Sequence, residues 1–525
     1  MSHSMIATRN KMTGVKFISP EQAAAIVSDD STVGLVGGGG GLVEASTLHE
    51  AIERRFLETG YPRNLTCIHA LGIGDRQRRG MNRFAHTGMT RRVIGGHWIW
   101  SPRMQQMAKD NEIEAYILPG GVIMQLMREV AAGRPGLITH VGLGTFVDPR
   151  QDGGRMNQAA KADLTELISI GGREYIRYLP IPISVALLRG SYADEDGNIS
   201  LEEEPANLDI YAMAAAAHNT GGKVIFQVKG KVPRNSLKAR EVRIPGALVD
   251  AVVIDPSQQQ SYDLFYDDAL SGEAYRENIK QTSLSFSSRL VIARRAKKEL
   301  VTGSVINFGF GIPDQVAKLI ALDGMAESYY QTIEHGTYGG QLLDGDLFGY
   351  AQNPTCMIDG PSQFDFYSGG GLDIAFLGFG EIDQHGNVNV SKLAGNTVGP
   401  GGFIDIAQNA RTVIFCGTFD TGGTSVEIGA GKLLIKANGR ITKLVKEVAQ
   451  ITFSGQQALV HGQRVIYVTE RAVFALTKNG VALIEIAPGV DLQNDVLDRM
   501  GFAPQIDTVP KIMDASLFYE NGDLP

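Results

Sequence analysis

The sequence predicts an α/β protein with two pseudo-symmetric domains, each built around a largely parallel sheet with flanking helices. The chain has 525 residues, more than one hydrophobic core normally accommodates, so we expect at least two domains. Short apolar segments rich in β-formers alternate with longer amphipathic stretches, which is typical of parallel α/β sheets. Segments of the first half also recur in the second, and this repeat indicates duplication of one α/β unit.

The first elements show the alternation clearly. Residues 31–36 predict a strand, residues 45–56 an amphipathic helix and residues 65–70 a second strand. A helix between two such strands provides the crossover connection that parallel strands require. This alternation favours an α/β fold with largely parallel sheets.

The repeat is carried by two pairs of segments. SVALLRGSYADEDGNIS (184–200) aligns without gaps with DIAFLGFGEIDQHGNVN (373–389), and KVIFQV (223–228) aligns with TVIFCG (412–417). Both pairs are offset by 189 residues. The aligned residues include Asp194 with Asp383 and Asn198 with Asn387. Two ungapped matches at one offset indicate a common structural unit rather than chance.

A third pair consists of glycine-rich turns. GLVGGGGGL (34–42) aligns with INFGFGIPD (306–314) at an offset of 272, each segment reading as a strand, a glycine turn and the start of a helix. The change of offset implies insertions in the first half. The backbone N–H groups of the turn at 37–41 would suit an anion, and a tight turn without a ligand is an equally good interpretation.

The boundary between the halves is predicted in a polar stretch. Residues 256–287 are rich in Gln, Asp, Ser and Tyr and contain no sustained periodic element. We therefore expect a first domain at 1–255, a linker at 256–287 and a second domain at 288–525. A functional site is expected where the two domains meet.

Composition restricts the function classes. A net charge of −8 weighs against nucleic-acid binding, and no apolar stretch is long enough to cross a membrane. The three cysteines, Cys67, Cys356 and Cys416, are too few and too widely spaced for a disulfide framework or a zinc knuckle. We expect a cytoplasmic protein without a metal site, a membrane partner or a nucleic-acid partner.

Glu334 is the main candidate for a catalytic residue. It ends an apolar strand and precedes three glycines in YYQTIEHGTYGG (329–340), and carboxyl ends of strands are where ligands bind in α/β folds. A lone glutamate is more often solvated surface. Aligning Gly72 with Gly336 places Ala70 opposite Glu334, so that only the second half carries the carboxylate.

Three further features are interpreted as structural. His335 either influences Glu334 or is a turn residue with a local backbone partner, and we favour the turn. His385 aligns with a turn position of the first repeat, which favours a turn over catalysis. An apolar stripe at helical spacing predicts a buried helix face, formed by Met124, Leu126, Met127 and Val130.

Several specific segments together carry a family resemblance. They are GLGTFVDPR (142–150), QFDFYSGGGLD (363–373), DQHGNVNVSK (383–392), GGFIDI (401–406), TERAVF (469–474) and EIAPGVDLQ (485–493). With these segments the chain resembles the family I CoA-transferases, in particular the bacterial short-chain acyl-CoA transferases of acetate and propionate. It is more distantly similar to succinyl-CoA:3-oxoacid CoA-transferase. The resemblance extends over essentially the whole chain.

The resemblance implies roles for individual residues. Glu334 matches the nucleophilic glutamate of the family, and Gly402, beside Gly401, matches the glycine whose N–H stabilises the oxyanion. A second glycine turn matches the segment that lies against CoA, with the candidate residues Asn307, Gly309 and Gly311. The resemblance further implies CoA as a co-substrate, no permanently bound cofactor, acyl-CoA and small carboxylates as binding partners, and a homo-oligomer such as a tetramer.

One position departs from the family pattern. The family commonly has a glutamine as a side-chain donor where LPGG (118–121) places Gly120. Losing such a donor costs about 10² to 10³ in rate unless another group replaces it. We therefore expect Gly120→Gln to raise kcat if the larger side chain fits.

The leading hypothesis is a ping-pong transferase that moves CoA between short-chain acyl-CoA and a small carboxylate such as acetate. An acyl-CoA hydrolase on the same scaffold is the enzymatic alternative. A non-catalytic sensor of CoA or another metabolite is the alternative from a different class, because fold alone does not fix function.

Overall fold

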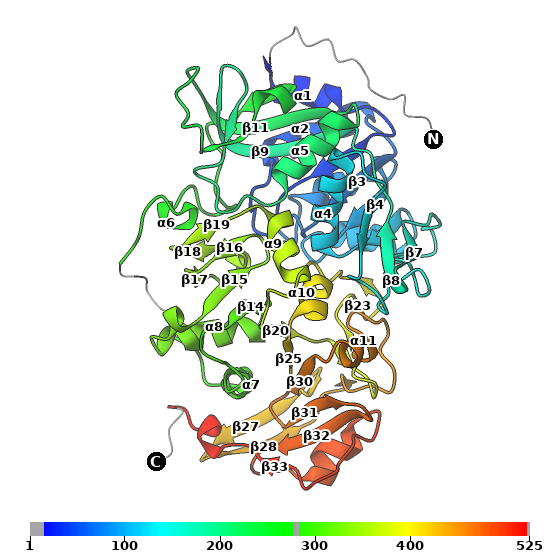
Figure 1. Ribbon diagram of the computed structural model, residues 1–525, viewed down its shortest axis with the longest axis vertical. Helices are drawn as coiled ribbons and strands as arrows, with labels where there is room; N and C mark the ends of the chain where they lie inside the picture. The colour runs from blue at the N-terminus through cyan, green and yellow to red at the C-terminus, as the bar shows by residue number, and fades with distance from the viewer. Residues whose placement is uncertain (1–14, 278, 280–282, 522–525) are drawn as a thin grey trace.

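The computed structural model describes residues 15–277, 279 and 283–521. Two ten-stranded sheets with flanking helices form the two halves of the chain, one above the other in Figure 1. The predicted α/β class is therefore confirmed.

The first sheet has the strand order β1-β13-β11-β9-β2-β3-β4-β5, and every pair along this path is parallel. Strands β10 and β12 join antiparallel beside β9. A small antiparallel sheet has the order β6-β8-β7. The bounds are β1 (Lys16–Phe17), β2 (Thr32–Leu35), β3 (Leu65–His69), β4 (Thr90–Gly95), β5 (Glu114–Ile117), β6 (Leu137–Thr139), β7 (Thr165–Ile170), β8 (Arg173–Tyr178), β9 (Val185–Asp194), β10 (Ile199–Ser200), β11 (Lys223–Val232), β12 (Val242–Ile244) and β13 (Ala251–Ile254).

The second sheet has the order β19-β16-β15-β14-β20-β25-β30-β31-β32-β33. Its central strands β15, β14, β20, β25 and β30 are parallel, and antiparallel strands extend it on both sides. The bounds are β14 (Val305–Phe308), β15 (Tyr330–Ile333), β16 (Thr337–Tyr338), β19 (Cys356–Met357), β20 (Ile374–Gly378), β25 (Thr412–Cys416), β30 (Arg464–Val468), β31 (Ala472–Thr477), β32 (Gly480–Ile486) and β33 (Lys511–Ile512).

Eleven α-helices and five short antiparallel strand pairs complete the described part of the chain. The helices are α1 (Pro20–Ile26), α2 (Ser46–Thr59), α3 (Pro102–Lys109), α4 (Gly120–Ala131), α5 (Ile210–Asn219), α6 (Asp268–Ser271), α7 (Ser288–Lys297), α8 (Ile312–Leu322), α9 (Gly360–Ser368), α10 (Phe403–Asn409) and α11 (Gly455–Val460). The pairs are β17 (Gln341–Leu342) with β18 (Ala351–Gln352), β21 (Glu381–Ile382) with β22 (Val388–Asn389), β23 (Lys392–Leu393) with β24 (Asn396–Thr397), β26 (Asp420–Thr421) with β29 (Ile441–Thr442), and β27 (Ser425–Gly429) with β28 (Lys432–Ala437).

The sheets confirm the predicted repeat. β9 begins at Val185 and β20 at Ile374, 189 residues apart, and β11 begins at Lys223 and β25 at Thr412 at the same spacing. The order β13-β11-β9-β2-β3 of the first sheet matches β30-β25-β20-β14-β15 of the second. The two halves therefore share one central five-stranded unit.

The register corrects the alignment of the glycine turns by one residue. Val33 pairs with Val185 in the first sheet, and Ile306 pairs with Ile374 in the second. Because Val185 and Ile374 are equivalent, Val33 is equivalent to Ile306, and the offset is 273 instead of 272. The predicted pairing of Gly34 with Ile306 is wrong because repeated glycines provide no side-chain pattern, and a slip of one residue moves each side chain to the opposite face of the sheet.

The neighbouring strands confirm the alignment of Ala70 with Glu334. Cys67 of β3 and Gln331 of β15 occupy equivalent positions beside β2 and β14. These two residues are 264 positions apart, which is the spacing that places Ala70 opposite Glu334. The second half therefore holds a carboxylate where the first half holds a methyl group.

A repeated turn also has the same structure in both halves. The Asp194 carboxylate accepts backbone hydrogen bonds from the residues two and four positions later, both at 2.9 Å, and Asp383 does the same at 2.9 and 3.0 Å. The side chains of Asn198 and Asn387 donate to these carboxylates. His385 is the residue two positions after Asp383, so its predicted place in a turn is confirmed.

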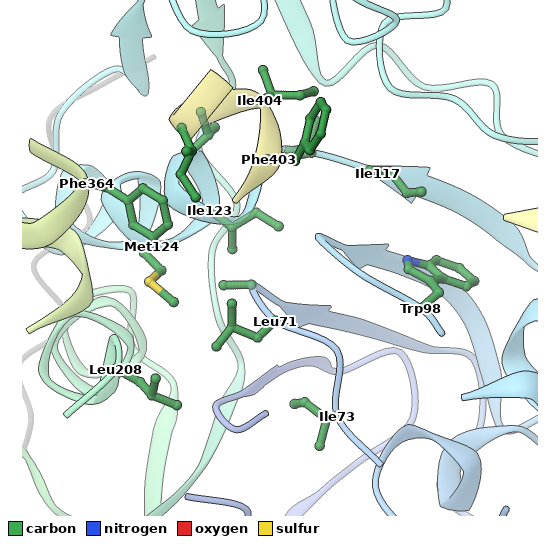
Figure 2. Packing of buried hydrophobic residues seen from close by; sticks show 14 of the residues in the cluster. Leu71, Ile73, Trp98, Ile117, Ile123, Met124, Leu208, Phe364, Phe403 and Ile404 are labelled. Carbon is green, nitrogen blue, oxygen red and sulfur yellow. The ribbon is translucent and has the colours of Figure 1, made fainter. Parts of the chain in front are cut away.

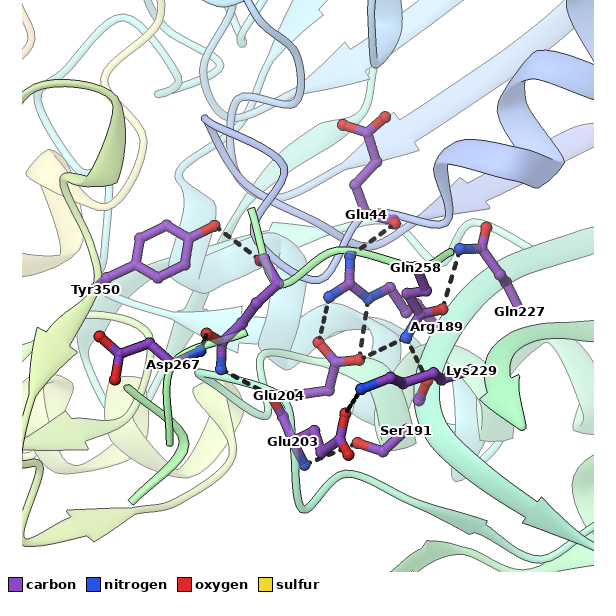
Figure 3. Close-up of polar contacts among 12 residues, drawn as sticks. Glu44, Arg189, Ser191, Glu203, Glu204, Gln227, Lys229, Gln258, Asp267 and Tyr350 are labelled. Atoms are coloured by element: carbon purple, nitrogen blue, oxygen red, sulfur yellow. Dashed lines mark hydrogen bonds and ion pairs between the residues drawn. The ribbon is translucent and has the colours of Figure 1, made fainter. Parts of the chain in front are cut away.

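The stretch after β13 is anchored to the first half by a buried polar network. Arg189 donates two hydrogen bonds to the Glu204 carboxylate, at 2.9 and 2.8 Å. The Gln258 amide donates to the same carboxylate at 3.1 Å, as Figure 3 shows. Because all three side chains are more than nine-tenths buried, these pairings satisfy groups that would otherwise be costly to bury.

The same stretch also contacts the second half. The Tyr350 hydroxyl donates to the Gln260 carbonyl at 3.3 Å (Figure 3). Among the described residues of 256–287, α6 is the one α-helix, and no strand of either large sheet lies there. The division at 1–255, 256–287 and 288–525 stays a prediction.

The hydrophobic core is continuous where α4, α9 and α10 meet in the middle of Figure 1. Phe364 of α9 lies beside Met124 of α4, and Phe403 of α10 belongs to the same cluster of buried residues (Figure 2). The predicted apolar stripe of α4 is confirmed as core, since all its members are buried: Met124, Leu126, Met127 and Val130. This packing fixes the elements that surround the site described next.

No helix of the described residues has the length and apolar character needed to cross a membrane. Cys67 and Cys416 are buried free thiols, and Cys356 is exposed and free.

Candidate active site

A cavity of about 460 Å³ lies between the two halves. Gly72, His97 and Trp100 line it from the first half, and Glu334 and Phe403 line it from the second. Apolar side chains and glycines form most of the wall. The cavity therefore combines the expected position at the interface with a low-polarity environment for the one carboxylate in its lining.

Glu334 follows directly after β15, at the carboxyl end of a parallel strand. Its side chain is 22% exposed. Burial raises the pKa of Glu334 to about 7, and a hydrogen bond from the Gly402 N–H offsets part of this rise. Near neutral pH the carboxylate is thus present but poorly solvated, a state suited to nucleophilic attack.

The turn Gly401–Gly402 connects the two halves beside this carboxylate. The Gly401 N–H donates to the Gly96 carbonyl at 2.8 Å, and the Gly401 carbonyl accepts from the Gly120 N–H at 2.7 Å. Gly402 is the N-cap of α10, and a Cβ atom there would lie 2.1 Å from Oε2 of Glu334. The close approach of the Gly402 backbone to Glu334 therefore depends on glycine at this position.

Asp405 reinforces the same junction from inside α10. Its carboxylate accepts from the N–H of Gly121 at 3.1 Å and from the N–H of Val122, both in the first turn of α4. The side chain is fully buried, and burial followed by the nearby Glu334 charge raises the pKa of Asp405 well above its usual range. Asp405 thus links α10 of the second half to α4 of the first.

The predicted CoA-contacting residues do not all line the cavity. Asn307 and Gly309 line the cavity, and Gly311 is the N-cap of α8, just beyond the lining. The Asn307 amide donates to the Thr332 carbonyl and to the Tyr367 hydroxyl, each at 3.3 Å. The side chain of Asn307 therefore holds β14 to its surroundings.

His335 lies beside Glu334 with a backbone partner. Nδ1 of His335 lies 3.2 Å from the Gly349 carbonyl, and Nε2 lies 3.9 Å from Oε1 of Glu334, too far for a hydrogen bond. Burial lowers the pKa of His335 to about 4, so the ring is neutral. The ring has a backbone partner, as expected, but this partner is 14 residues away, so the expectation of a local partner is wrong.

The first half has no room for a side chain at the position that departs from the family pattern. A Cβ atom on Gly120 would lie 3.0 Å from the Ala70 carbonyl oxygen and 3.1 Å from the carbonyl carbon of Gly401. The expectation that Gly120→Gln raises kcat is therefore not supported, because the larger side chain would meet fixed backbone on two sides. Gly120 contributes its N–H to the junction with Gly401 instead.

The five-glycine turn of the first half has the geometry of a tight turn. The Gly38 N–H donates to the Leu42 carbonyl at 2.8 Å, and the Gly40 N–H donates to the Gly74 carbonyl at 3.2 Å. A Cβ atom on Gly39 would lie 2.1 Å from the Trp100 ring. The glycines therefore allow the aromatic ring that lines the cavity to pack against the turn.

Four residues at or beside the site are not among the candidates expected from the sequence: Arg76, His97, Trp100 and Asp405. His97 could have been found by the rule that identified Glu334, since it lies two residues beyond β4, at the carboxyl end of a parallel strand. Asp405 lies within the quoted GGFIDI segment, but only the folded chain shows that it faces α4. Arg76 and Trp100 carry no comparable sequence signal.

Comparisons with known proteins identify the family. The family model described as "Coenzyme A transferase" matches residues 17–255. The chain is 43% identical to the acetate CoA-transferase YdiF of Escherichia coli O157:H7 over 96% of each chain, and 44% identical to the caffeate CoA-transferase of Acetobacterium woodii over 97% of this chain and 98% of the relative. A crystal structure of the E. coli O157:H7 acyl-CoA transferase YdiF in a thioester complex with CoA is similar with a TM-score of 0.92, at 42% identity over 97% of this chain and 98% of that one. The chain therefore belongs to the coenzyme A transferase family.

Proposed function

We propose that the protein transfers CoA between a short-chain acyl-CoA and a small carboxylate such as acetate, through a CoA thioester on Glu334. The observation that carries this proposal is the position of Glu334. Its carboxylate lies in an apolar cavity between the halves, with a pKa of about 7 and the Gly402 N–H bound to it. A relative solved as a CoA thioester complex supports the covalent step.

The proposed reaction has two halves. The Glu334 carboxylate attacks the acyl-CoA carbonyl and expels the CoA thiolate, which gives a mixed anhydride. The thiolate then attacks the glutamyl carbonyl and expels the substrate acid, so that CoA stays on the enzyme as a thioester. An incoming carboxylate reverses both steps and leaves as a new acyl-CoA.

These steps require hydrogen-bond donors that the protein holds in position before the reaction. Each addition creates an oxyanion, and the Gly402 N–H is fixed next to Glu334 before the reaction begins. The apolar wall strengthens this interaction by keeping water away. In the proposal the Asn307–Gly311 turn accommodates CoA, since its residues 307–310 line the same cavity as Glu334.

An aromatic acyl group is a second candidate for the group carried by the donor. Aromatic side chains form much of the cavity wall, namely Trp100, Phe308, Phe310, Phe348, Phe379 and Phe403. One of the relatives is named for caffeate, an aromatic acid. An aromatic acyl group would pack against such rings, so an aromatic acyl-CoA is the second candidate donor.

A panel of acyl-CoA donors and carboxylate acceptors tests the proposal. We expect acetyl-, propionyl- and butyryl-CoA to exchange with acetate-sized acids, and a preference for aromatic donors would favour the second candidate instead. The hydrolase alternative is tested by leaving out the acceptor, since a transferase then stops after one turnover and a hydrolase continues. Absence of exchange with every pair would refute the proposed activity.

Domain division and assembly complete the proposal. We place the domains at 1–255 and 288–525, in agreement with the family model at 17–255. We further propose that the protein is cytoplasmic and forms a homo-oligomer. Light scattering on the purified protein checks the oligomeric state directly.

A further inference from the structure

The ring of His97 lies in the cavity and has no hydrogen-bond partner among the described residues. The residue follows β4 and lines the cavity from the first half, and its side chain is half-buried. Over residues 15–277, 279 and 283–521, no other group forms a hydrogen bond with either ring nitrogen of His97. Because the side chain is only half-buried and lines the cavity, the ring is open to a group that enters it.

The ring belongs to the same junction as the carboxylate. A Cβ atom on Gly401 would lie 3.9 Å from Oε1 of Glu334 and also 3.9 Å from Cβ of His97, so the two residues flank this glycine. A Cβ atom on Gly72 would lie 2.7 Å from Nδ1 of His97. Glycine at position 72 thus leaves the space that the ring occupies, beside the reactive group of the other half.

The other first-half donors in the lining already have contacts. The Arg76 guanidinium forms an ion pair with Asp346 at 3.4 Å and stacks 4.0 Å from the centre of the Trp100 ring. Trp100 packs its indole edge against Gly39, where a Cβ atom would lie 2.6 Å from Nε1. His97 therefore differs from Arg76, whose guanidinium already has an ionic partner.

The donors from the second half are engaged as well. The Asn307 amide binds the Thr332 carbonyl and the Tyr367 hydroxyl, and Nδ1 of His335 faces the Gly349 carbonyl. Apart from these residues and Glu334, the described lining from this half consists of apolar side chains and glycines.

His97 is also in the right protonation state to donate. Burial, followed by the neighbouring His69 and Arg76, lowers the pKa of His97 to about 4. A neutral imidazole carries one N–H donor and one acceptor nitrogen. The ring can therefore bind an oxygen atom without adding a positive charge to the cavity.

We propose that His97 is a substrate-binding residue that donates its ring N–H to an oxygen of the acyl or carboxyl group reacting with Glu334. The inference rests on the proposed function of this cavity. It assigns one hydrogen-bond donor to each half of the chain, His97 from the first and Gly402 from the second. A carboxyl group between them would be oriented by both halves at once, which explains why the site needs the interface.

The test compares two substitutions of similar size that differ in donor capacity. His97→Phe keeps a planar ring but has no N–H group, and His97→Gln keeps a side-chain N–H donor. We expect His97→Phe to lower kcat/KM for both acyl-CoA and carboxylate by about 10² to 10³, the usual effect of losing one such donor. We expect His97→Gln to retain activity within about tenfold of the wild type.

Circular dichroism and thermal melting of each variant separate a loss of the donor from a loss of the fold. Folded His97→Phe with wild-type kcat/KM, or a folded His97→Gln as impaired as His97→Phe, would overturn the proposal. Failure of the proposed function would look different, because the wild-type protein itself would then transfer no CoA. Retained activity in His97→Gln is the decisive result, because glutamine would not preserve activity if the His97 ring only filled space.

Discussion

Asp405 of the second half accepts a hydrogen bond of 3.1 Å from the backbone N–H of Gly121 in the first half. This contact joins the N-terminal turn of α4 to the helix whose N-cap is Gly402, the residue bound to Glu334. The position of the Glu334 carboxylate and its donor thus depends on an interaction between buried groups of different halves. Predictions about Asp405, Gly402 and Glu334 follow from this relationship.

Asp405→Ala should destabilise the protein and reduce turnover. The substitution leaves the N–H groups of Gly121 and Val122 without their acceptor, at a cost of about 1 to 3 kcal/mol for each buried group. Asp405→Asn keeps an acceptor oxygen and should retain most of the activity. Thermal melting and kcat, measured on both variants, check this, and an asparagine variant as damaged as the alanine variant would contradict it.

The same residue predicts a pH dependence of stability. The pKa of Asp405 is raised in the folded protein, so the folded state binds a proton that the unfolded state has released. Stability contributed by this group is complete below the pKa of the unfolded state and is lost as the pH rises towards the folded pKa. The melting temperature of Asp405→Asn relative to wild type should therefore increase with pH, and a difference that is constant or decreases would refute the assignment.

Gly402→Ala should reduce kcat by about 10² or more, since displacing a reacting group by about an ångström has effects of this size. The added methyl group would lie 2.1 Å from Oε2 of Glu334. The φ angle of Gly402 is −83°, so backbone strain does not contribute. Gly429→Ala is the matched control, because a Cβ atom there meets no atom within 4 Å. Equal activity of the two variants would show that Gly402 is not close to the reaction.

The first half-reaction should accelerate with pH up to about 7 and then level off. In the proposed mechanism only the ionised form of Glu334 attacks, and burial raises the pKa of Glu334 to about 7. Between pH 5.5 and 8.5 the ionised fraction then rises about 30-fold, which sets the expected change in rate. Rapid-mixing measurement of CoA adduct formation over this range is the appropriate experiment, and a rate independent of pH would contradict the raised pKa.

The elements that the sequence predicts well are those with a strong local pattern. Strand β3 was expected at 65–70 and spans Leu65–His69, and the 189-residue offset fits the starts of both β9 and β20. The glycine turns were misaligned by one residue because their side chains carry no pattern. Regular periodicity therefore determines these elements, whereas runs of glycine leave the register open until the strands pair.

Some features of the site likewise have a local sequence signal, and others depend on how the chain packs. Glu334 stands out because a carboxylate follows an apolar strand, and that signal is local. The contacts of Asp405 with α4 and the unpartnered ring of His97 depend on residues hundreds of positions away. The lack of space at Gly120 is likewise visible only once the Ala70 and Gly401 backbones are in place. Packing between the halves, which no single segment encodes, creates these features.

The attachment site of CoA tests the central claim most directly. Incubation with acyl-CoA and no acceptor should leave one CoA per active site, bound as a thioester to Glu334, because the first half-reaction needs only the donor and the enzyme. Peptide mapping after borohydride reduction should find the modification on the peptide that contains Ile333, Glu334 and His335, and Glu334→Gln should abolish both the adduct and turnover. A CoA adduct on another residue, or full turnover by Glu334→Gln, would contradict the assignment of Glu334 as the nucleophile.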